Sequence, residues 1–477
     1  MQTNIPQIMD EEKRKKEIAK FIKLTSEFFE RERIEELAWE EKFAQRESTI
    51  TGHLFLSVFV FAISIYGVPT FEKLAGLFHD ILAGVEITRE AVYQRITEKA
   101  EKFFERLLSM TISLTIPDAV KLDMLKHFAH VIILDSTSFQ LPDELAEYFR
   151  GSGGDASKSA IKIQFGYDIK SGLFFYKLQD GTCSDINYQN NFVEMFEKDD
   201  LSLRDLGYFN LRVLEELDEK DAYFLSRLHM QNGRIWIQDE HGQWVQADLL
   251  DLVQNLSEDI VELDVYVASP KHRIKARLVI ERLPEQAKNQ RLRKLRQDCQ
   301  RQKRPLTDRA RTLASFNFFI SNIEEQYLPK EQFRLLYSIR WQIELVFKAW
   351  KSNFALDKIT SSKAHVVKTF LYAKLIFIFL TTKMIRIVKN WTWMERRKEV
   401  SEYRAYKHFQ TIAHNWMMAI VREPDTVTEI LLDALKFISK SCIKCKRKGR
   451  QLPFEILEEI SGSALPDSVG TGTYGLA

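Results

Sequence analysis

Three acidic residues lie where strands and a helix could bring them together. Asp135 directly follows VIIL, an apolar and β-branched run typical of a buried strand. A short strand candidate over 201–203 leads into Asp205, and Glu344 lies in YSIRWQIELVFKAWKSN (337–353), which predicts one helix. Three carboxylates in one place repel one another unless a cation lies between them. The pattern therefore predicts that Asp135, Asp205 and Glu344 bind metal and are catalytic, although each acid alone could be structural.

The predicted helix around Glu344 also groups side chains that could bind phosphate. At about 100° per residue, Tyr337, Arg340, Glu344, Lys348 and Lys351 fall on one side, and the opposite side is apolar. A solvated face with ordinary ion pairs would give the same pattern. Beside a metal-binding acid, however, an arginine fork, a lysine point charge and a tyrosine hydroxyl are suited to hold phosphates.

Magnesium is the metal that this set of ligands favours. Mg²⁺ prefers carboxylate oxygens and keeps positions open for water and phosphate. Two Mg²⁺ ions in one active site can activate a water or a 3′-hydroxyl and stabilise the leaving oxygen of a phosphodiester, and Mn²⁺ can substitute. The sequence contains no glycine-rich phosphate loop of the Walker type, so we expect no nucleotide cofactor.

The elements that must position these groups change in kind along the chain. Helical patterns fill the first part, with one amphipathic helix expected over 10–47, and the chain is helical again beyond 355. The middle alternates between strands and helices, so we expect a mixed α/β or α+β fold. The expected elements there are a hairpin over 160–181, a helix over 209–219, strands over 222–228, 233–283 and 315–323, and a basic helical segment over 287–313.

A candidate DNA-reading unit precedes the strands. TFEKLAGLF (70–78) and ITREAVYQRITEKAEKFF (87–104) predict two helices separated by a break, with Thr88 as an N-cap. A helix-turn-helix of this kind would leave Arg89 and Arg95 exposed for DNA binding. Plain packing of two helices explains the spacing equally well.

Positive charge is concentrated locally rather than spread over the chain. The formal net charge of the 477 residues is only +2, but residues 288–311 hold ten Lys or Arg against two Asp. A charge run is usually a solvated face, yet such one-sided charge also suits binding to a nucleic-acid backbone. The same two interpretations apply to the basic run over 440–450, which includes Lys444. The contacts expected in the first segment are Arg291, Arg293, Lys294 and Arg296.

The composition favours a protein of a reducing compartment without a membrane span. Four cysteines are too few for a disulfide framework. The apolar run over 53–68 is short, and the run over 369–385 is interrupted by Lys374 and Lys383, so both predict core helices. We expect a cytoplasmic, nucleoid-associated protein.

Three motifs together resemble a known family. VIILDST, RDLGYF and Y-x-x-R-x-x-x-E-x-x-x-x-x-x-K resemble the signatures of bacterial insertion-sequence DDE transposases, and most closely those of the insertion-sequence-four family. The resemblance extends over about residues 50–440, and the Tyr-Arg-Glu-Lys pattern is its most specific part. It implies a dimeric enzyme that cuts and pastes double-stranded DNA through hairpin intermediates, acting on terminal inverted repeats and target DNA.

The resemblance also implies roles for residues and regions. Asp135, Asp205 and Glu344 would be the acids of an RNase H-like domain interrupted by a β-rich insertion and flanked by helical regions. Arg227 matches a family arginine near the active site. Phe316 stands where the family usually has a tryptophan that stacks on a flipped base, so base capture is in doubt here. The implied regions are 1–127 (helical, DNA-binding), 128–228 (catalytic, first part), 229–325 (insertion), 326–360 (catalytic helix), 361–460 (helical, for DNA contact or dimerisation) and 461–477 (flexible tail).

Two other functions fit the same residues. An RNase H-like nuclease would cleave DNA without rejoining it, which a strand-transfer assay distinguishes. A regulator descended from a transposase would bind DNA without cleaving it, and acids at all three catalytic positions argue against that alternative.

Overall fold

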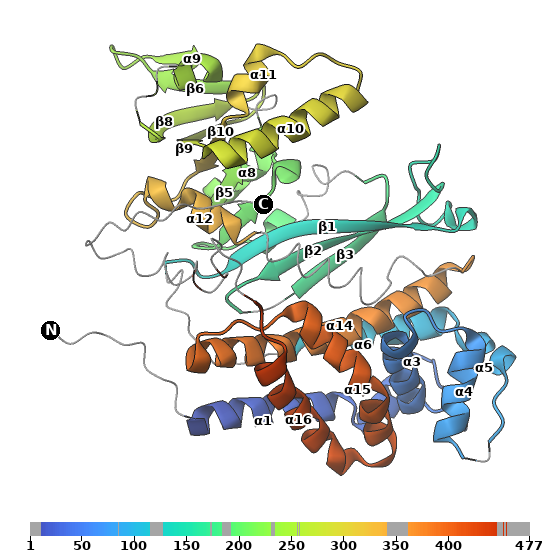
Figure 1. The fold of residues 1–477 in the computed structure, drawn as a ribbon. Coiled ribbons are helices and arrows are strands. Elements are labelled where there is room, and N and C mark those ends of the chain that lie inside the picture. The colour runs from blue at the N-terminus through green and yellow to red at the C-terminus, as the bar shows by residue number, and fades with distance from the viewer. Residues whose placement is uncertain are drawn as a thin grey trace.

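A large mixed sheet runs through the molecule and separates two groups of helices (Figure 1). The computed structural model describes residues 11–83, 85–114, 127–171, 174–183, 192–229, 234–254, 256, 258–340, 361–445, 452 and 455. Within these residues the sheet has ten strands in the order β3-β2-β1-β4-β5-β10-β9-β8-β6-β7. This mixed architecture confirms the expected combination of helices and sheet.

The strands follow the expected segments closely, apart from β7, which was not anticipated. β4 and β5 run parallel to β1, and all other neighbouring pairs are antiparallel. The bounds are β1 Val131–Leu141, β2 Ser159–Asp168, β3 Phe174–Asp180, β4 Leu201–Arg204, β5 Tyr223–Arg227, β6 Arg234–Gln238, β7 Trp244–Ala247, β8 Ile260–Ala268, β9 Arg273–Arg282 and β10 Phe316–Ser321.

The strand that contains Asp135 is longer than the sequence suggested. The expectation that it ends before Asp135 is wrong, because β1 continues to Leu141. Its parallel pairing with β4 stops at Ile133, whereas its antiparallel pairing with β2 continues to the end of the strand. Asp135 therefore lies just past the last pair that β1 forms with β4, with one neighbouring strand still beside it.

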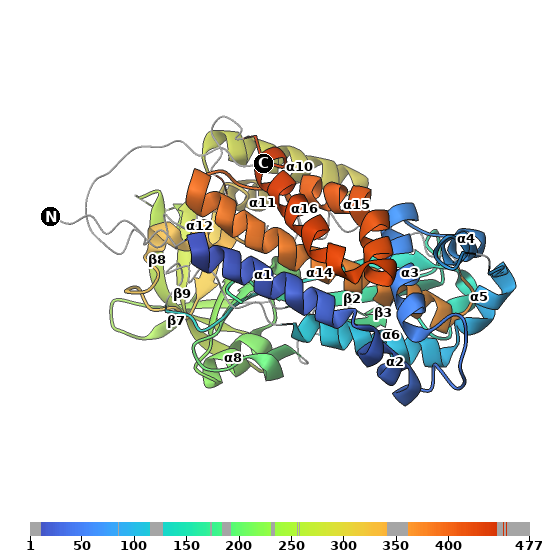
Figure 2. The same ribbon diagram turned by 90° about the horizontal axis from the view of Figure 1, so that it is seen from below.

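The helices near the two chain ends pack together beneath β1, β2 and β3 (Figures 1 and 2). Figure 2 shows α1, α14 and α16 side by side, although they lie far apart in sequence. Their bounds are α1 Glu11–Phe28, α2 Arg31–Glu40, α3 Gly52–Tyr66, α4 Phe71–Ile81, α5 Arg89–Arg95, α6 Glu98–Ser113, α14 Ala364–Arg396, α15 Glu402–Arg422 and α16 Val427–Ser441, with a short 3₁₀ helix η6 Pro424–Thr426.

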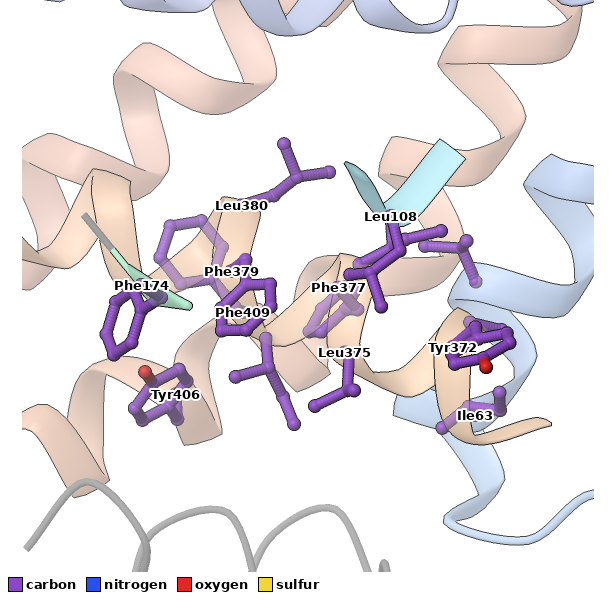
Figure 3. Packing of buried hydrophobic residues seen from close by; sticks show 14 of the residues in the cluster. Ile63, Leu108, Phe174, Tyr372, Leu375, Phe377, Phe379, Leu380, Tyr406 and Phe409 are labelled. Carbon is purple, nitrogen blue, oxygen red and sulfur yellow. The ribbon is translucent and has the colours of Figure 1, made fainter. Parts of the chain in front are cut away.

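Aromatic side chains of α14 form the centre of this helical core (Figure 3). The Phe377 ring lies 5.7 Å from that of Phe61 in α3 and 6.1 Å from that of Trp416 in α15. The Phe379 ring stacks at 5.1 Å on Phe174 of β3 and so joins the helices to the sheet. Both apolar runs are thus core helices, as predicted, and no described helix is long and apolar enough to cross a membrane.

Two predicted helices are broken. The single helix expected over 10–47 is wrong, because α1 ends at Phe28 and α2 begins at Arg31. The single helix expected over 87–104 is also wrong, because α5 ends at Arg95 and α6 begins at Glu98. The expected N-cap at Thr88 is confirmed, since its hydroxyl accepts a hydrogen bond from a backbone N–H of α5.

The two faces of the sheet are covered by different elements. On one face, Ile133, Leu203 and Phe319 join the core of α3, α6 and α14, and we call this the helical face. On the other face, Leu134 and Phe224 pack with α8, and we call this the α8 face. The remaining elements are α8 Leu211–Glu219, α9 Leu249–Gln254, α10 Glu285–Arg301, α11 Asp308–Leu313, α12 Phe333–Ser338, η1 Asp143–Leu145, η2 Val193–Met195, η3 Leu206–Tyr208 and η4 Lys330–Gln332.

Candidate active site

Three neighbouring parallel strands place polar residues in one row on the helical face. Ile133 in β1 pairs with Leu203 in β4. Leu203 pairs in turn with Leu225 in β5, two residues before Arg227. Side chains alternate between the two faces along a strand. Asp135, Asp205 and Arg227 each lie two positions after one of these paired residues, so all three are on the helical face and form a row across the strands. Neighbouring strands lie roughly 5 Å apart. The two acids predicted to act together are therefore side by side, with a cation next in the row.

Asp205 is also contacted from the helix that follows the sheet. It caps η3 in an extended conformation directly after β4, as expected for a residue at a strand end. The Tyr337 hydroxyl donates to its Oδ1 at 3.3 Å, and Arg340 Nη2 lies 3.7 Å from the same atom. The Arg340 side chain is 13 % exposed and that of Asp205 43 % exposed. The contact therefore lies at the edge of a partly open site.

Tyr337 is held among aromatic and charged groups. Its ring lies 5.3 Å from that of Phe319 in β10, and the Arg340 guanidinium lies 5.6 Å from its centre. Burial raises the pKa of Tyr337, and Asp205 raises it further, against the lowering effect of Arg340 and Arg227. The hydroxyl therefore stays protonated and remains a hydrogen-bond donor at neutral pH.

The surroundings of Asp135 are built by the β1–β2 pair. Its Oδ1 accepts a hydrogen bond from the backbone N–H of Ser136 at 2.7 Å. Across the sheet, buried Gln164 of β2 accepts a 2.6 Å hydrogen bond from the Tyr208 hydroxyl. Tyr208 lies in η3, directly after Asp205, so this bond ties the turn that carries one acid to the strand beside the other.

The third expected acid lies outside the described residues, as do Lys348 and Lys351. The part of the expected helix that is described differs from the prediction, because α12 begins before Tyr337 and ends at Ser338. Glu344 being undescribed, no group of three metal-ligating side chains is found in the described part of the chain. Asp135 and Asp205 still supply oxygen ligands in one row, which fits a hard divalent cation.

Two arginines near the site, Arg227 and Arg291, repel each other. Burial, and after it the charge of Arg227, lower the pKa of Arg291 to about 10. The Arg227 Nε atom is buried, and within the described residues it has no hydrogen-bond partner. Arg291 instead donates to the backbone oxygen of Phe316 and to Asn317 Oδ1, both at 2.7 Å. Arg291 thus points into the protein, whereas a DNA contact was expected of it.

The other basic residues of α10 point outward. Arg293, Lys294 and Arg296 are exposed, and within the described residues they take part in no ion pair. The predicted basic helix is interrupted, because α10 ends at Arg301 and α11 begins at Asp308. The three outward side chains of α10 are therefore available to bind a polyanion.

Phe316 is covered by the protein. It is 4 % exposed and lies in the core on the α8 face, with the Arg282 guanidinium 5.0 Å from its ring centre. A base could stack on this ring only after that packing opens.

Other expected DNA contacts are already paired within the chain. Arg89 forms ion pairs with Glu72 at 3.0 Å and with Glu90 at 2.5 Å. Arg95 is half-buried and donates to the Ile50 carbonyl at 2.8 Å and to the Ser48 hydroxyl. Their roles in DNA binding stay predictions.

Lys444, from the expected basic run over 440–450, is also engaged. Its Nζ lies 2.5 Å from Oε1 of fully buried Glu399. This contact fixes the segment after α16 to the helical core. Residues 446–450 of the same run lie outside the described part of the chain.

Three polar residues near the site were not singled out from the sequence. Glu281, Asn317 and Arg334 form a buried chain of contacts between β9, β10 and α12. Asn317 directly follows Phe316 in the strand predicted over 315–323, and this position was the available signal. The two charged residues come from segments distant in sequence, which no local pattern connects.

Comparison with known proteins shows the family to which the chain belongs. Residues 126–380, more than half of the chain, match the family model described as "Transposase DDE domain". The chain therefore belongs to the DDE transposase family. It is a DDE-type DNA transposase, and its partner is DNA. DDE transposase domains generally use divalent metal ions, in agreement with the carboxylate row.

Several curated relatives extend over nearly the whole chain. The transposase for insertion sequence element IS231F from Bacillus thuringiensis subsp. israelensis is 27 % identical over 460 residues, covering 92 % of this chain and 95 % of its own. The transposase for IS1151 from Clostridium perfringens is 29 % identical over 468 residues, which cover 94 % of this chain and 97 % of the relative. The transposase for IS231E from Bacillus thuringiensis subsp. finitimus is 28 % identical over 443 residues, covering 89 % and 92 %.

Proposed function

We propose that this chain is a cut-and-paste transposase of the insertion-sequence-four type that excises its element through hairpin intermediates. The observation that carries the proposal is the row of Asp135, Asp205 and Arg227, with Tyr337 and Arg340 placed over Asp205. A metal-dependent enzyme that cleaves a phosphodiester needs both kinds of group, carboxylates to bind the metal ion and cations to bind the phosphate.

The acids and the cations have separate roles in this proposal. Asp135, Asp205 and Glu344 would hold two Mg²⁺ ions, which supply Lewis acidity to the phosphodiester when bound. Arg340 would contact a phosphate through its planar fork, and Tyr337 would donate one hydrogen bond to the same region. The roles proposed for Lys348, Lys351 and Arg227 are further contacts to the phosphates of the transposon end.

The sheet supports the proposed domain organisation. The order β3-β2-β1-β4-β5, with a leading antiparallel hairpin and parallel β4 and β5, supports an RNase H-like catalytic domain over 128–228 and 326–360. β5 and β10 are neighbours in the sheet, so the chain leaves and returns at one place. That return supports an insertion over 229–325 that extends the same sheet.

Recognition and synapsis of the ends are assigned to the remaining regions. The N-terminal helices over 1–127 would bind the end DNA, and two protomers would bring the two ends together, with the helical region over 361–460 at their contact. The outward basic face of α10 supports a DNA path along the proposed insertion.

Cleavage of labelled DNA that carries the inverted repeats flanking the gene tests the proposal. Wild type, Asp135→Ala and Asp205→Ala are compared with and without Mg²⁺, and binding of the ends is measured in parallel. We expect Mg²⁺-dependent cuts at the repeat ends that yield hairpins. Each variant should bind the ends but lose at least about 100-fold in nicking rate.

Three results would contradict this expectation. Cuts scattered without regard to the repeats would favour a nuclease. End binding without any cleavage by the wild type would favour a DNA-binding regulator. Cuts at the repeat ends that yield no hairpins would reject the hairpin pathway and indicate a DDE transposase of another cleavage type. A thermal shift of the wild type by Mg²⁺ or Mn²⁺, absent in Asp135→Ala, checks metal binding apart from activity.

A further inference from the structure

A continuous polar chain joins the basic helix α10 to the helix that carries Tyr337. Arg291 Nη2 of α10 donates to Asn317 Oδ1 of β10 at 2.7 Å. Asn317 Nδ2 donates to Glu281 Oε2 of β9 at 2.8 Å. Glu281 Oε1 lies 3.0 Å from Arg334 Nε of α12. Four elements from different parts of the sequence are thus connected by three short contacts.

The middle of this chain is buried, so its contacts are not weakened by water. Asn317 is 5 % exposed and Glu281 8 % exposed. Glu281 and Asn317 are register partners in β9 and β10, and strand alternation puts both on the helical face with Phe319. Buried charged and amide groups hold their partners in fixed positions, because leaving either unpaired is costly.

A second contact from β9 holds the start of the same helix. Arg277, four residues before Glu281, pairs with Glu262 of β8 at 2.6 Å and donates to the Ile323 and Leu328 carbonyls at 2.7 and 2.9 Å. Its guanidinium lies 5.1 Å from the ring centre of Phe333, the first residue of α12. The segment leading into α12 and its first turn are thus attached to β9.

The C-terminal end of α12 reaches the active site. Tyr337 is three residues after Arg334, so the two side chains lie on neighbouring parts of one helical surface. A displacement of Arg334 would move Tyr337 away from Asp205, which its hydroxyl contacts at 3.3 Å. Misplacement of a catalytic group by about 1 Å can lower a rate about 100-fold.

We propose that Arg291, Asn317 and Glu281 are positioning residues that align α12, and with it Tyr337 and Arg340, over Asp205. Through Arg291 the same chain connects the active site to the α10 helix, whose exposed residues face DNA. Arg291 then acts from inside the protein, whereas its neighbour Arg293 contacts the DNA backbone. The inference rests on the proposed chemistry at Asp135 and Asp205.

The test separates the rate of nicking from the affinity for DNA. Single-turnover nicking of a labelled transposon end is measured at saturating protein, and end affinity is measured by gel shift. We expect Glu281→Ala and Arg291→Met to lower the saturated rate at least about tenfold, with affinity within about threefold of wild type. Arg293→Ala should instead weaken binding, and Gln300→Ala, an exposed change on the same helix, should alter neither quantity.

Two further measurements distinguish positioning from loss of structure. Glu281→Gln and Arg291→Lys keep part of the hydrogen bonding, so each should recover part of the rate, and they replace the harsher variants if those do not fold. The double variant Glu281→Ala/Arg291→Met should be about as slow as the slower single variant, because both changes act through Asn317.

The result that would overturn the inference is a saturated rate that stays at the wild-type value in folded Glu281 and Arg291 variants. A loss explained entirely by weaker DNA binding would overturn it equally. Asp205→Ala, assayed alongside, keeps the two proposals apart. If Asp205→Ala abolishes nicking and the Glu281 variants do not slow it, only the positioning role fails. If Asp205→Ala nicks normally, the proposed active site fails.

Discussion

At the scale of single residues, Tyr337 gives the clearest link between environment and chemistry. Its hydroxyl donates to Asp205, and burial raises its pKa above the ordinary value near 10. The phenol therefore keeps its proton throughout the range in which a DNA-cleaving enzyme is assayed. It can donate its one hydrogen bond to Asp205, as it does here, or to a phosphate, but it cannot serve as a base.

We predict that Tyr337→Phe lowers the nicking rate by about tenfold to 100-fold, the effect of one hydrogen bond to a charged group. The ratio of wild-type to variant rate should stay constant between about pH 6 and 9, since the raised pKa leaves no titration of the phenol there. Single-turnover rates across this range check the prediction. A ratio that falls toward one as the pH approaches 9 would mean that the phenol titrates and is not the donor described.

At the scale of elements, a lysine of α14 closes the end of α6. Lys383 Nζ donates to the carbonyls of Thr111 at 2.9 Å, of Ile112 at 3.1 Å and of Leu114. The last carbonyls of a helix have no partner within the helix, so a buried helix end needs donors from elsewhere. Lys383 supplies them and so joins the N-terminal helices to α14.

We predict that Lys383→Met lowers the free energy of unfolding by about 2 kcal/mol, because buried carbonyls lose their donor. Burial lowers the pKa of Lys383 to about 7, whereas in the unfolded chain it is near 10.4. Between these values the unfolded state holds the extra proton, so this lysine adds stability as the pH rises from about 7 to 10. Urea unfolding of both proteins at several pH values measures the difference. Parallel pH curves for the two proteins would contradict the lowered pKa.

Element types could be predicted from the sequence better than element ends. The strand before Asp205 and the hairpin over 160–181 were predicted because alternation and turn residues are local signals. The length of β1 was not predicted, because residues Ser136 to Leu141 are kept extended by pairing with β2, a contact that local sequence does not reveal. The break between α5 and α6 was missed because the apolar spacing continues across Thr97, and only the backbone geometry there separates the helices.

The site could be predicted in part for the same reason. Asp135 and Asp205 follow apolar runs, and their place in one row depends only on parallel pairing of two neighbouring strands. Glu281 and Arg334 could not be connected to them, because their contact depends on β9 joining the sheet beside β10. Pairing between segments so far apart leaves no periodic signal in either one.

At the scale of the whole molecule, the sheet connects two ends with different surfaces. Figure 1 shows α10 beside β8, β9 and β10 at one end, and α1 among the helices at the other. The formal net charge is only +2, so binding of DNA depends on where the charge lies rather than on its total. On the outward face of α10, Arg293, Lys294 and Arg296 form no ion pair with the described residues, whereas the sequence of α1 has four acidic residues beside its six basic ones.

We predict that Arg293→Ala/Arg296→Ala reduces the salt dependence of end binding. Each lost phosphate contact lowers the slope of log affinity against log salt by about 0.9, so the double variant should lose about 1.8. The matched control is Lys198→Ala/Lys220→Ala, two exposed lysines just before β4 and β5, at the strand ends opposite Asp205 and Arg227; it removes the same charge away from α10. Gel shifts between about 50 and 200 mM salt measure both slopes. Equal slopes for the two double variants would place the DNA path away from α10. A cation that contacts a phosphate releases counterions, whereas a cation elsewhere on the protein does not.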